Sequence, residues 1–150
     1  MYYADDAMET RAQGWRTLAS LHARIEDALE KALQREHGLS VVEYTVLDTL
    51  SRQAGLHMRM QQLARAAALS HSATTRLVNR LETRGLLTRD LCTDDRRGIY
   101  SELTPAGQKL LSAARPTHDR TLYAALEEAE SLPELAPLVR ALHALPTAER

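Results

Sequence analysis

The segment 60–107 constrains the fold of this chain more than any other part. Its apolar residues form short stretches that are joined by very short connections, in place of one long helical stripe. Residues 61–67 have the length of a two-turn helix, and Ser70 or Ser72 can cap a second helix that follows it. Only residues 68–69 separate the two. Two short helices joined so tightly are the layout of a helix-turn-helix, whose second helix enters the major groove of DNA.

The predicted second helix, which ends at Gly85, has one apolar and one polar side. At 100° per residue, the apolar side consists of Ala73, Thr74, Leu77, Val78 and Leu81. The polar side consists of Ser72, Thr75, Arg76, Asn79 and Thr83. It carries hydrogen-bonding groups and no carboxylate before Glu82, which suits base edges and phosphates. The alternative is an ordinary solvated surface.

A β-hairpin is predicted directly after these helices. Two extended runs, 87–92 and 99–103, flank a turn-forming group at 93–98. A hairpin beside a helix-turn-helix is the wing of a winged helix, and an arginine at its tip can reach a minor groove. Asp95 stands two residues before Arg97 and can orient its guanidinium by a charge-assisted hydrogen bond. A solvated turn with an incidental ion pair is the alternative.

Helices are predicted on the N-terminal side of this segment. A three-then-four spacing ends at Gly38 and indicates a seam between helices; its members are Trp15, Leu18, His22, Ile25, Leu29 and Ala32. Ser40 and Glu43 form the pattern of a capping box that opens another helix. The residues expected to be buried in that helix are Val42, Val46, Leu47 and Leu50.

Helices are also predicted on the C-terminal side. Thr104 followed by Pro105 marks a helix start, and an apolar stripe continues through Leu110, Leu111, Ala114, His118, Leu122, Tyr123 and Leu126. Pro116 should kink or divide this helix. Ser131 and Glu134 form a second capping-box pattern before a short last helix that contains Leu135, Leu138, Val139 and Leu142. With only two isoleucines and five valines, the chain is predicted to be mainly α, with one small hairpin.

Length and charge agree with one compact chain that has a basic centre. The 150 residues exclude two enzyme-sized domains. Residues 59–97 hold eight basic and four acidic side chains, a net charge of +4, whereas the remainder carries −5. A basic centre between acidic arms points to a polyanionic partner, although an arginine-rich composition alone can produce such a fluctuation.

The ordered motifs of the central segment resemble those of the MarR-type winged helix-turn-helix transcription regulators. The resemblance rests on residues 62–64, on 74–82 with 85–87, and on Asp95-Arg96-Arg97 followed by 103–107. It implies a homodimer on a palindromic double-stranded DNA operator. Residues 1–37 and 105–150 would then form the helical dimerisation region, and 38–104 the winged helix-turn-helix. The sequence departs from the family pattern at Cys92 and Thr93, where Asp-Pro is frequent.

The resemblance also implies roles for single residues. Ser72, Thr75, Arg76 and Asn79 correspond to groove-facing positions of the recognition helix, with His71 and Arg80 at its edges. Arg97 corresponds to a minor-groove arginine at the wing tip, with Asp95 as its orienting partner and Arg96 as a phosphate contact. The family commonly responds to a small-molecule effector held between the dimer helices and the winged region. Candidates for that site are Trp15, His22, Tyr44 and Arg115, because an aromatic anchor with a cation suits a planar acid such as a phenolic carboxylate. Packing in the helical stripe is the alternative for Trp15 and His22.

Two alternative functions are a redox-responsive regulator and a winged-helix module for protein contact. The only thiol, Cys92, lies at the base of the wing, whereas sensing cysteines of similar regulators usually lie in the N-terminal helix. An incidental thiol is therefore favoured. Arg76 and Arg97 argue against a module that reads no DNA.

Other classes find little support in the sequence. The six histidines never occur at a helical metal-site spacing, and no phosphate loop, nucleophile turn or converging carboxylate pair indicates an enzyme. We therefore predict no catalytic residue, metal or cofactor. The longest stretch without a charged residue is 66–75, too short to span a membrane, and Asp5, Asp6 and Glu9 are atypical of a signal peptide. A cytoplasmic location is expected.

Overall fold

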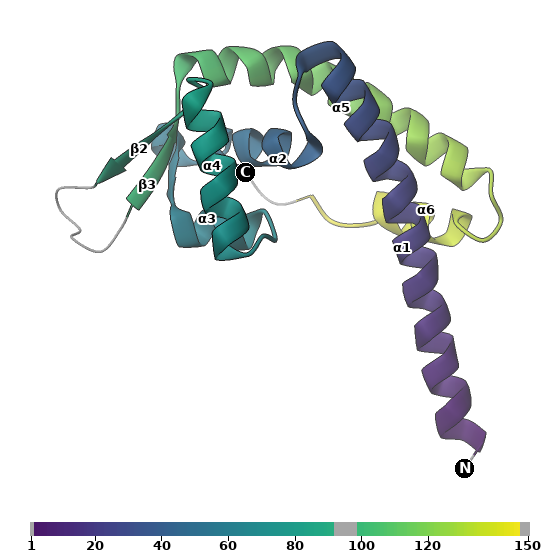
Figure 1. The fold of residues 1–150 in the computed structure, drawn as a ribbon. Coiled ribbons are helices and arrows are strands. Elements are labelled where there is room, and N and C mark those ends of the chain that lie inside the picture. Colours follow the sequence, from purple (N-terminus) through teal and green to yellow (C-terminus); the bar gives the residue numbers. More distant parts are fainter. Residues whose placement is uncertain (1, 92–98, 148–150) are drawn as a thin grey trace. The chain divides into compact units, whose positions relative to one another are not determined.

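The computed structural model describes residues 2–91 and 99–147 and divides the chain into two compact units (Figure 1). The winged unit comprises Leu33–Thr117, and the arm unit comprises Met1–Ala32 with His118–Arg150. Two long helices, α1 (Tyr2–His37) and α5 (Pro105–Glu130), each contribute residues to both units. The predicted mainly helical class with a winged helix-turn-helix is confirmed.

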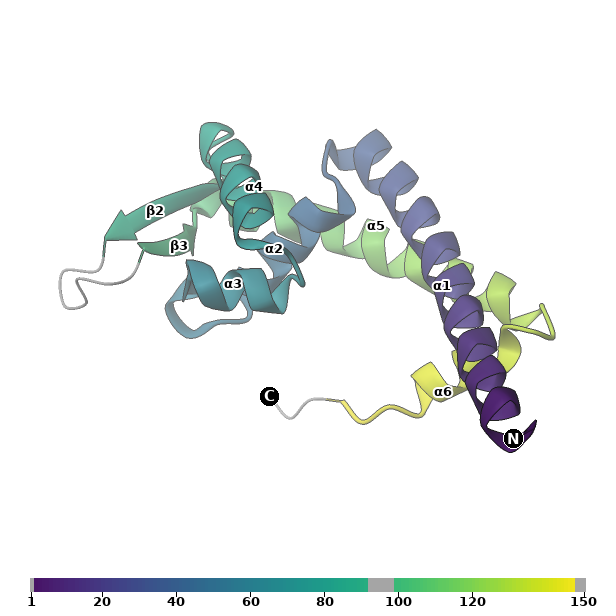
Figure 2. The ribbon, with the colours of Figure 1, turned by 60° about the horizontal axis from the view of Figure 1, so that its bottom comes forward.

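The winged unit contains three short helices and a small sheet. Its elements in chain order are α2 (Val41–Ser51), the 3₁₀ turn η1 (Ala54–Leu56), β1 (His57–Arg59), α3 (Met60–Ala66), α4 (His71–Thr83), β2 (Leu87–Leu91) and β3 (Ile99–Leu103). Figures 1 and 2 both show α3 beside α4, with β2 and β3 next to them. The strands are antiparallel in the order β1-β3-β2. The predicted hairpin is therefore present.

The first strand of this sheet was not predicted. β1 pairs with β3 so that His57 lies opposite Glu102 and Arg59 lies opposite Tyr100. It has only three residues, too few for an alternating pattern to stand out from the helices around it. The sheet therefore has three strands, where the sequence predicted two.

Local signals fix the main helix boundaries as predicted. Ser40 and Glu43 form a complete capping box at the start of α2, in which the Glu43 N–H donates to Ser40 Oγ over 3.0 Å and the Ser40 N–H donates to Glu43 Oε1 over 2.9 Å. Thr104 Oγ1 accepts the N–H of Gly107 over 3.0 Å, at the start of α5. Gly38, at φ +62°, ends α1, because glycine adopts this left-handed conformation without steric cost.

The core of the winged unit comes mostly from leucine and valine side chains of α2, α3 and α4. Its fully buried members include Val46, Leu47, Leu50, Leu63, Val78 and Leu81. The prediction that Val42 is buried is wrong, since its side chain is 37% exposed and Val41 is buried instead. The two positions are rotated by 100° on the helix, so only one of them can face this part of the core.

The arm unit packs α1 and α5 with the short helix α6 (Ala136–His143) around Leu21, Ala129, Leu135 and Val139. Farther toward its N-terminus, α1 is covered much less. Residues 5–20 are exposed apart from the half-buried Ala12 and Thr17. Trp15 and Leu18, two members of the predicted stripe, are 69% and 46% exposed.

Two expectations for the C-terminal helices are corrected. Of the two effects expected of Pro116, a kink or a division, the division does not occur, since α5 is continuous to Glu130; one proline removes a single N–H donor while the neighbouring turns keep their bonds. The predicted capping box of Ser131 and Glu134 does not form. The Ser131 hydroxyl donates to the Glu128 carbonyl over 2.6 Å, and α6 begins only after Leu135, without a side-chain cap.

Candidate nucleic-acid interface

The helix α4 is fixed by a cap at its N-terminal end and by the burial of one of its sides. Ser70 caps it, accepting the N–H of Ala73 through Oγ over 3.2 Å. Ala68, at φ +54°, turns the chain between α3 and α4. The buried side consists of Thr74, Leu77, Val78 and Leu81, as the helical pattern predicted, whereas Ala73, which was expected on the same side, is half-buried. This packing fixes which side of α4 faces outward.

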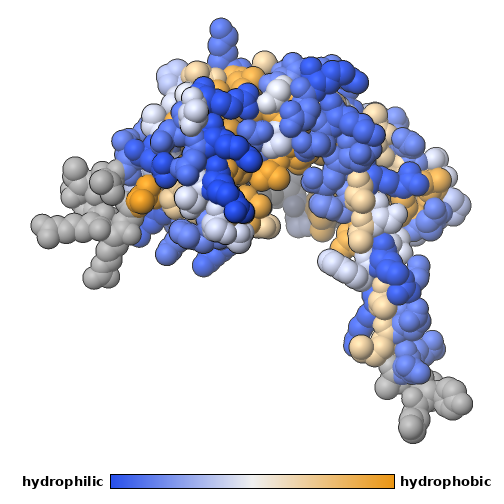
Figure 3. Space-filling model, viewed as in Figure 1, coloured by the Kyte–Doolittle hydropathy of each residue, from blue (hydrophilic) through white to orange (hydrophobic). Residues whose placement is uncertain are grey.

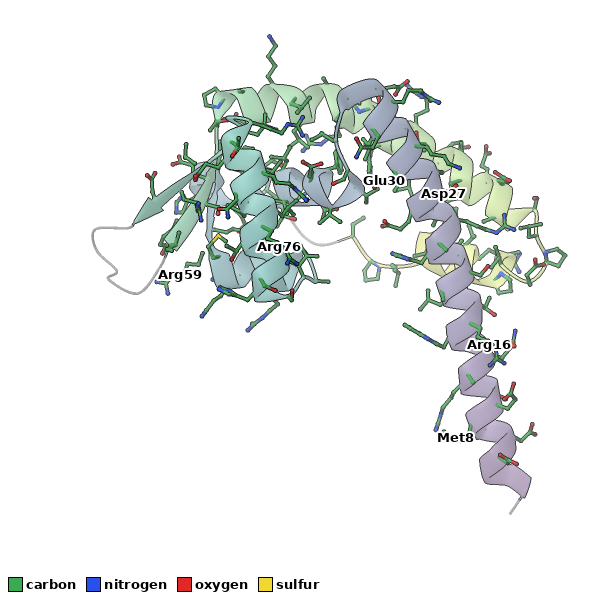
Figure 4. The ribbon with its side chains drawn as sticks, in the orientation of Figure 1. Met8, Arg16, Asp27, Glu30, Arg59 and Arg76 are labelled. Atoms are coloured by element: carbon green, nitrogen blue, oxygen red, sulfur yellow. The ribbon has the colours of Figure 1, made fainter. Side chains whose placement is uncertain are left out.

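The outward side of α4 carries the predicted reading residues. His71, Ser72, Arg76, Asn79 and Arg80 are exposed, and Thr75 is half-buried. The Thr75 hydroxyl donates to the His71 carbonyl over 3.0 Å. Hydrophilic side chains cover this side of the helix in Figure 3, and Arg76 is labelled on it in Figure 4. The structure therefore carries all six predicted residues on α4, five of them exposed.

A cross-element ion pair that the sequence did not reveal neutralises the carboxylate of α4. Arg89 of β2 donates from Nε to Glu82 Oε2 over 3.1 Å and from Nη2 to Oε1 over 3.4 Å. These hydrogen bonds from Arg89 lower the pKa of Glu82, so the carboxylate is ionised and paired. The polar side of α4, which carries Arg76 and Arg80, therefore has a net positive charge.

The residues predicted for the wing tip belong to the segment 92–98, which the structure does not describe. The predicted contacts Asp95, Arg96 and Arg97, and also Cys92, lie outside the described residues. The strands that lead to the tip are β2, ending at Leu91, and β3, beginning at Ile99. The DNA contacts of Asp95, Arg96 and Arg97 stay predictions from the sequence.

Two of the four candidate ligand residues are brought together in the winged unit. Arg115 of α5 donates to Asp48 Oδ1 over 2.9 Å and to Ser51 Oγ over 3.2 Å, and it also interacts with the buried Tyr44. The bond to Asp48 is the largest cause that raises the pKa of Arg115. Burial alone would raise the pKa of Asp48, but the bonds and charges of Arg52 and Arg115 together lower it. The cluster is thus a charged link between α2 and α5.

The other two candidates lie on the part of α1 that belongs to the arm unit. Trp15 is 69% exposed, and His22 Nε2 lies 3.5 Å from Glu26 Oε1. Within the described residues, no group of three or more histidine, cysteine or acidic side chains is placed to hold a metal ion. Over the same residues, no helix combines the length and apolar character of a membrane span.

Known proteins with similar sequences share this architecture. A family model described as the MarR family matches residues 37–98. The HTH-type transcriptional regulator MhqR of Bacillus subtilis is 30% identical over 101 residues, which are 67% of this chain and 68% of that protein. The chain belongs to the MarR family.

Two further known proteins are similar to this chain over different shares of its length. The uncharacterized HTH-type transcriptional regulator YkoM of Bacillus subtilis is 30% identical over 84 residues, 56% of this chain, and the match spans about half of YkoM, 53% of its length. The crystal structure of Sco3205, a MarR family transcriptional regulator from Streptomyces coelicolor in complex with DNA, has a TM-score of 0.74 and 29% identity. That alignment covers 87% of this chain and 81% of Sco3205.

Proposed function

We propose that this MarR-family chain is a transcription regulator that reads double-stranded operator DNA with α4. The observation that carries the proposal is the outward side of α4, where arginine, amide and hydroxyl groups are exposed while Glu82 is paired with Arg89. Arginine and asparagine are the side chains that make bidentate contacts to guanine and adenine. The similarity to Sco3205, which was crystallised with DNA, supports the same conclusion.

The wing is the second part of the proposed DNA surface. Arg97 enters the minor groove, Asp95 orients its guanidinium, and Arg96 contacts a phosphate. Supporting this, β2 and β3 form the two sides of a hairpin that leads to these residues. We assign residues 38–104 to this DNA-binding region.

The regulator acts as a homodimer on a palindromic operator, with dimerisation through residues 1–37 and 105–150. Support comes from the arm unit, where Met8, Trp15, Leu18 and Tyr123 are 62%, 69%, 46% and 65% exposed. Met8 is labelled on the N-terminal part of α1 in Figure 4. A helix that leaves such side chains in water gains little stability from its own chain. A second copy would cover them and would place two α4 helices for two half-sites.

A small-molecule acid releases the dimer from DNA in this proposal. Arg115 and Tyr44 provide a cation and an aromatic ring within one cluster, and Trp15 and His22 are the further candidates on α1. An aromatic acid bound at Arg115 would compete with Asp48 for the guanidinium and disturb the link between α2 and α5. We propose that the protein is a repressor, and that the acid shifts the dimer toward a spacing of its two α4 helices that no longer matches one turn of DNA.

The deciding experiment is an electrophoretic mobility shift of the purified protein on DNA from upstream of its own gene, at two salt concentrations and with excess unrelated DNA. We expect selective retardation with one dimer per site, weakened at the higher salt by counterion release. Adding aromatic acids should then reduce retardation. Equal retardation of operator and unrelated DNA would contradict sequence reading, and affinity unchanged by every acid tested would contradict the release mechanism alone.

A further inference from the structure

Arg84 ends the reading helix and reaches back to the end of α1. It is the C-terminal cap of α4, and its backbone N–H donates to the Arg80 carbonyl over 3.2 Å. Its side chain donates from Nη1 to the Gly38 carbonyl over 3.1 Å and to Glu43 Oε2 over 3.2 Å. One guanidinium therefore bonds both to the turn that follows α1 and to the first turn of α2.

The turn that Arg84 contacts connects α1 to the helices of the winged unit. Only residues 38–40 separate α1 from α2. Gly38 has a φ of +62°, and the next residue, Leu39, is fully buried. Apolar burial is non-directional, whereas a hydrogen bond depends on the angles at its donor and acceptor. The bonds of Arg84 therefore add a directional constraint that the packing of Leu39 does not supply.

Burial and charge both favour these bonds. The Glu43 side chain is 10% exposed and that of Arg84 is 39% exposed, so water competes for the carboxylate less than it does in an ion pair on an open surface. The Gly38 carbonyl follows the C-terminal end of α1, where the helix dipole favours a cation. The guanidinium also lies close to this turn, since a Cβ at Gly38 would be 3.9 Å from Arg84 Nη2. Arg84 is thus placed to hold the ends of α1 and α4 and the start of α2 in one arrangement.

We infer that Arg84 is a positioning residue for operator binding, which fixes the orientation of α4 against the end of α1 through Gly38 and Glu43. The inference rests on the proposed homodimer and deepens it, because α1 belongs to the region assigned to dimerisation. The last residues of α1, 33–37, lie in the winged unit together with α4. Two α4 helices match half-sites one turn of DNA apart only when each keeps a fixed orientation on its own dimerisation helix. Arg84 therefore restricts the half-site spacing that the dimer accepts, without touching DNA.

The test uses the site that the mobility-shift experiment selects, together with two altered sites that have one base pair added to or removed from the centre. Each change rotates one half-site by about 35° and moves it by about 3.4 Å relative to the other. We expect the wild-type protein to bind the altered sites about 10-fold more weakly than the unaltered site. In Arg84→Ala this spacing ratio should fall to about threefold. The variant should also bind the unaltered site more weakly, because only a fraction of its dimers has the matching arrangement.

Three further variants separate position from charge and from stability. Arg84→Lys keeps a cation that can donate to the carbonyl and the carboxylate, and should restore most of the spacing ratio. Glu43→Gln leaves Arg84 in place but weakens one of its bonds, so its ratio should be intermediate. Lys109→Ala removes a positive charge from an exposed position on α5 in the same unit and should leave the ratio unchanged. Melting temperatures above that of the binding assay show that each variant is folded.

The outcomes distinguish this inference from the proposed function. A wild-type spacing ratio in Arg84→Ala, or in Glu43→Gln if the alanine variant does not fold, overturns the positioning role and leaves the regulator intact. The slope of log affinity against log salt should be unchanged in Arg84→Ala; a slope reduced by about one would make Arg84 a phosphate contact and also overturn the inference. Equal binding of the wild-type protein to all three sites overturns it as well, although selective DNA reading stands. No selective binding of the wild-type protein to any DNA overturns the proposed function, and the positioning role with it.

Discussion

Replacement of Glu43 should destabilise the winged unit more than its place in a helix first turn suggests. Its side chain is only 10% exposed. One oxygen accepts the Ser40 N–H over 2.9 Å and the other accepts Arg84 Nη1 over 3.2 Å. Arg84 also donates to the Gly38 carbonyl over 3.1 Å. The Glu43 carboxylate therefore joins the start of α2 to the end of α4, and Arg84 extends the link to the end of α1.

The expected magnitude follows from these contacts. Loss of the bond from the Ser40 N–H to the Glu43 carboxylate costs about 1 kcal/mol, while the Ser40 hydroxyl still caps the N–H of residue 43. A hydrogen bond to a charged group contributes about 1.5 to 3 kcal/mol, but Arg84 is 39% exposed and water compensates much of its loss, so about 1 kcal/mol is appropriate. Glu43→Ala should therefore lower the free energy of unfolding by about 2 kcal/mol. Glu43→Gln can still cap Ser40 and should lose about half of that.

Urea unfolding at one fixed protein concentration measures both variants, because dimerisation would make stability depend on concentration. The matched control is Glu134→Ala, which alters the second capping-box pattern of the chain, the one that does not form. It should stay within about 0.5 kcal/mol of wild type. A Glu43→Ala protein as stable as the Glu134→Ala protein would refute the reasoning, and equal losses in Glu43→Gln and Glu43→Ala would refute the contribution of the cap.

Three other predictions concern recognition, packing and pH. Arg76→Ala should weaken selective operator binding by about 1 to 3 kcal/mol and relax sequence preference; a uniform loss on all DNA in competition assays would contradict base reading. Gly107→Ala should destabilise by about 1 to 3 kcal/mol in urea unfolding, because a Cβ would collide with the Leu86 carbonyl, whereas Gly14→Ala, with open space around it, should stabilise its helix by up to about 1 kcal/mol. The folded-state pKa of Asp48 is lowered, so its stabilising contribution is complete above its ordinary value of 3.8 and is lost as pH falls through the lower folded value. Asp48→Asn should accordingly lose stability at pH 7 and show a smaller further loss on acidification, and parallel pH profiles would contradict this.

The two capping-box patterns show how far local sequence determines the structure. Gly38, two residues before Ser40, has a φ of +62° and ends the preceding helix, so the Ser40 hydroxyl is available to cap the next one. Ser131 comes directly after α5, and its hydroxyl donates back to the Glu128 carbonyl. The same residue types at the same spacing therefore give different structures. The conformation of the preceding residues decides which bond the serine makes.

The reading surface was predictable to the extent that it depends on helical periodicity alone. Positions of α4 alternate between core and solvent as its sequence indicates. The interactions that hold Arg59 and Arg115 in place, by contrast, join residues far apart in the chain. Arg59 and Tyr100 are 41 positions apart, and Arg115 and Asp48 are 67. No spacing rule connects such residues, because only the register of β1 with β3 and the packing of α5 on α2 bring them together.

The apolar stripe of α1 follows the predicted helical spacing, but part of it stays exposed within the single chain. Its last members, Leu29 and Ala32, are buried, whereas Trp15 and Leu18 remain exposed although they obey the same spacing. Exposure of a tryptophan brings no gain to a monomer, since burying such a side chain contributes about 2 to 3 kcal/mol. A helical period specifies which residues share a face, but it does not specify whether the covering surface belongs to the same molecule. The exposed half of the stripe is therefore the strongest support within the described residues for the proposed second copy, which would bury it.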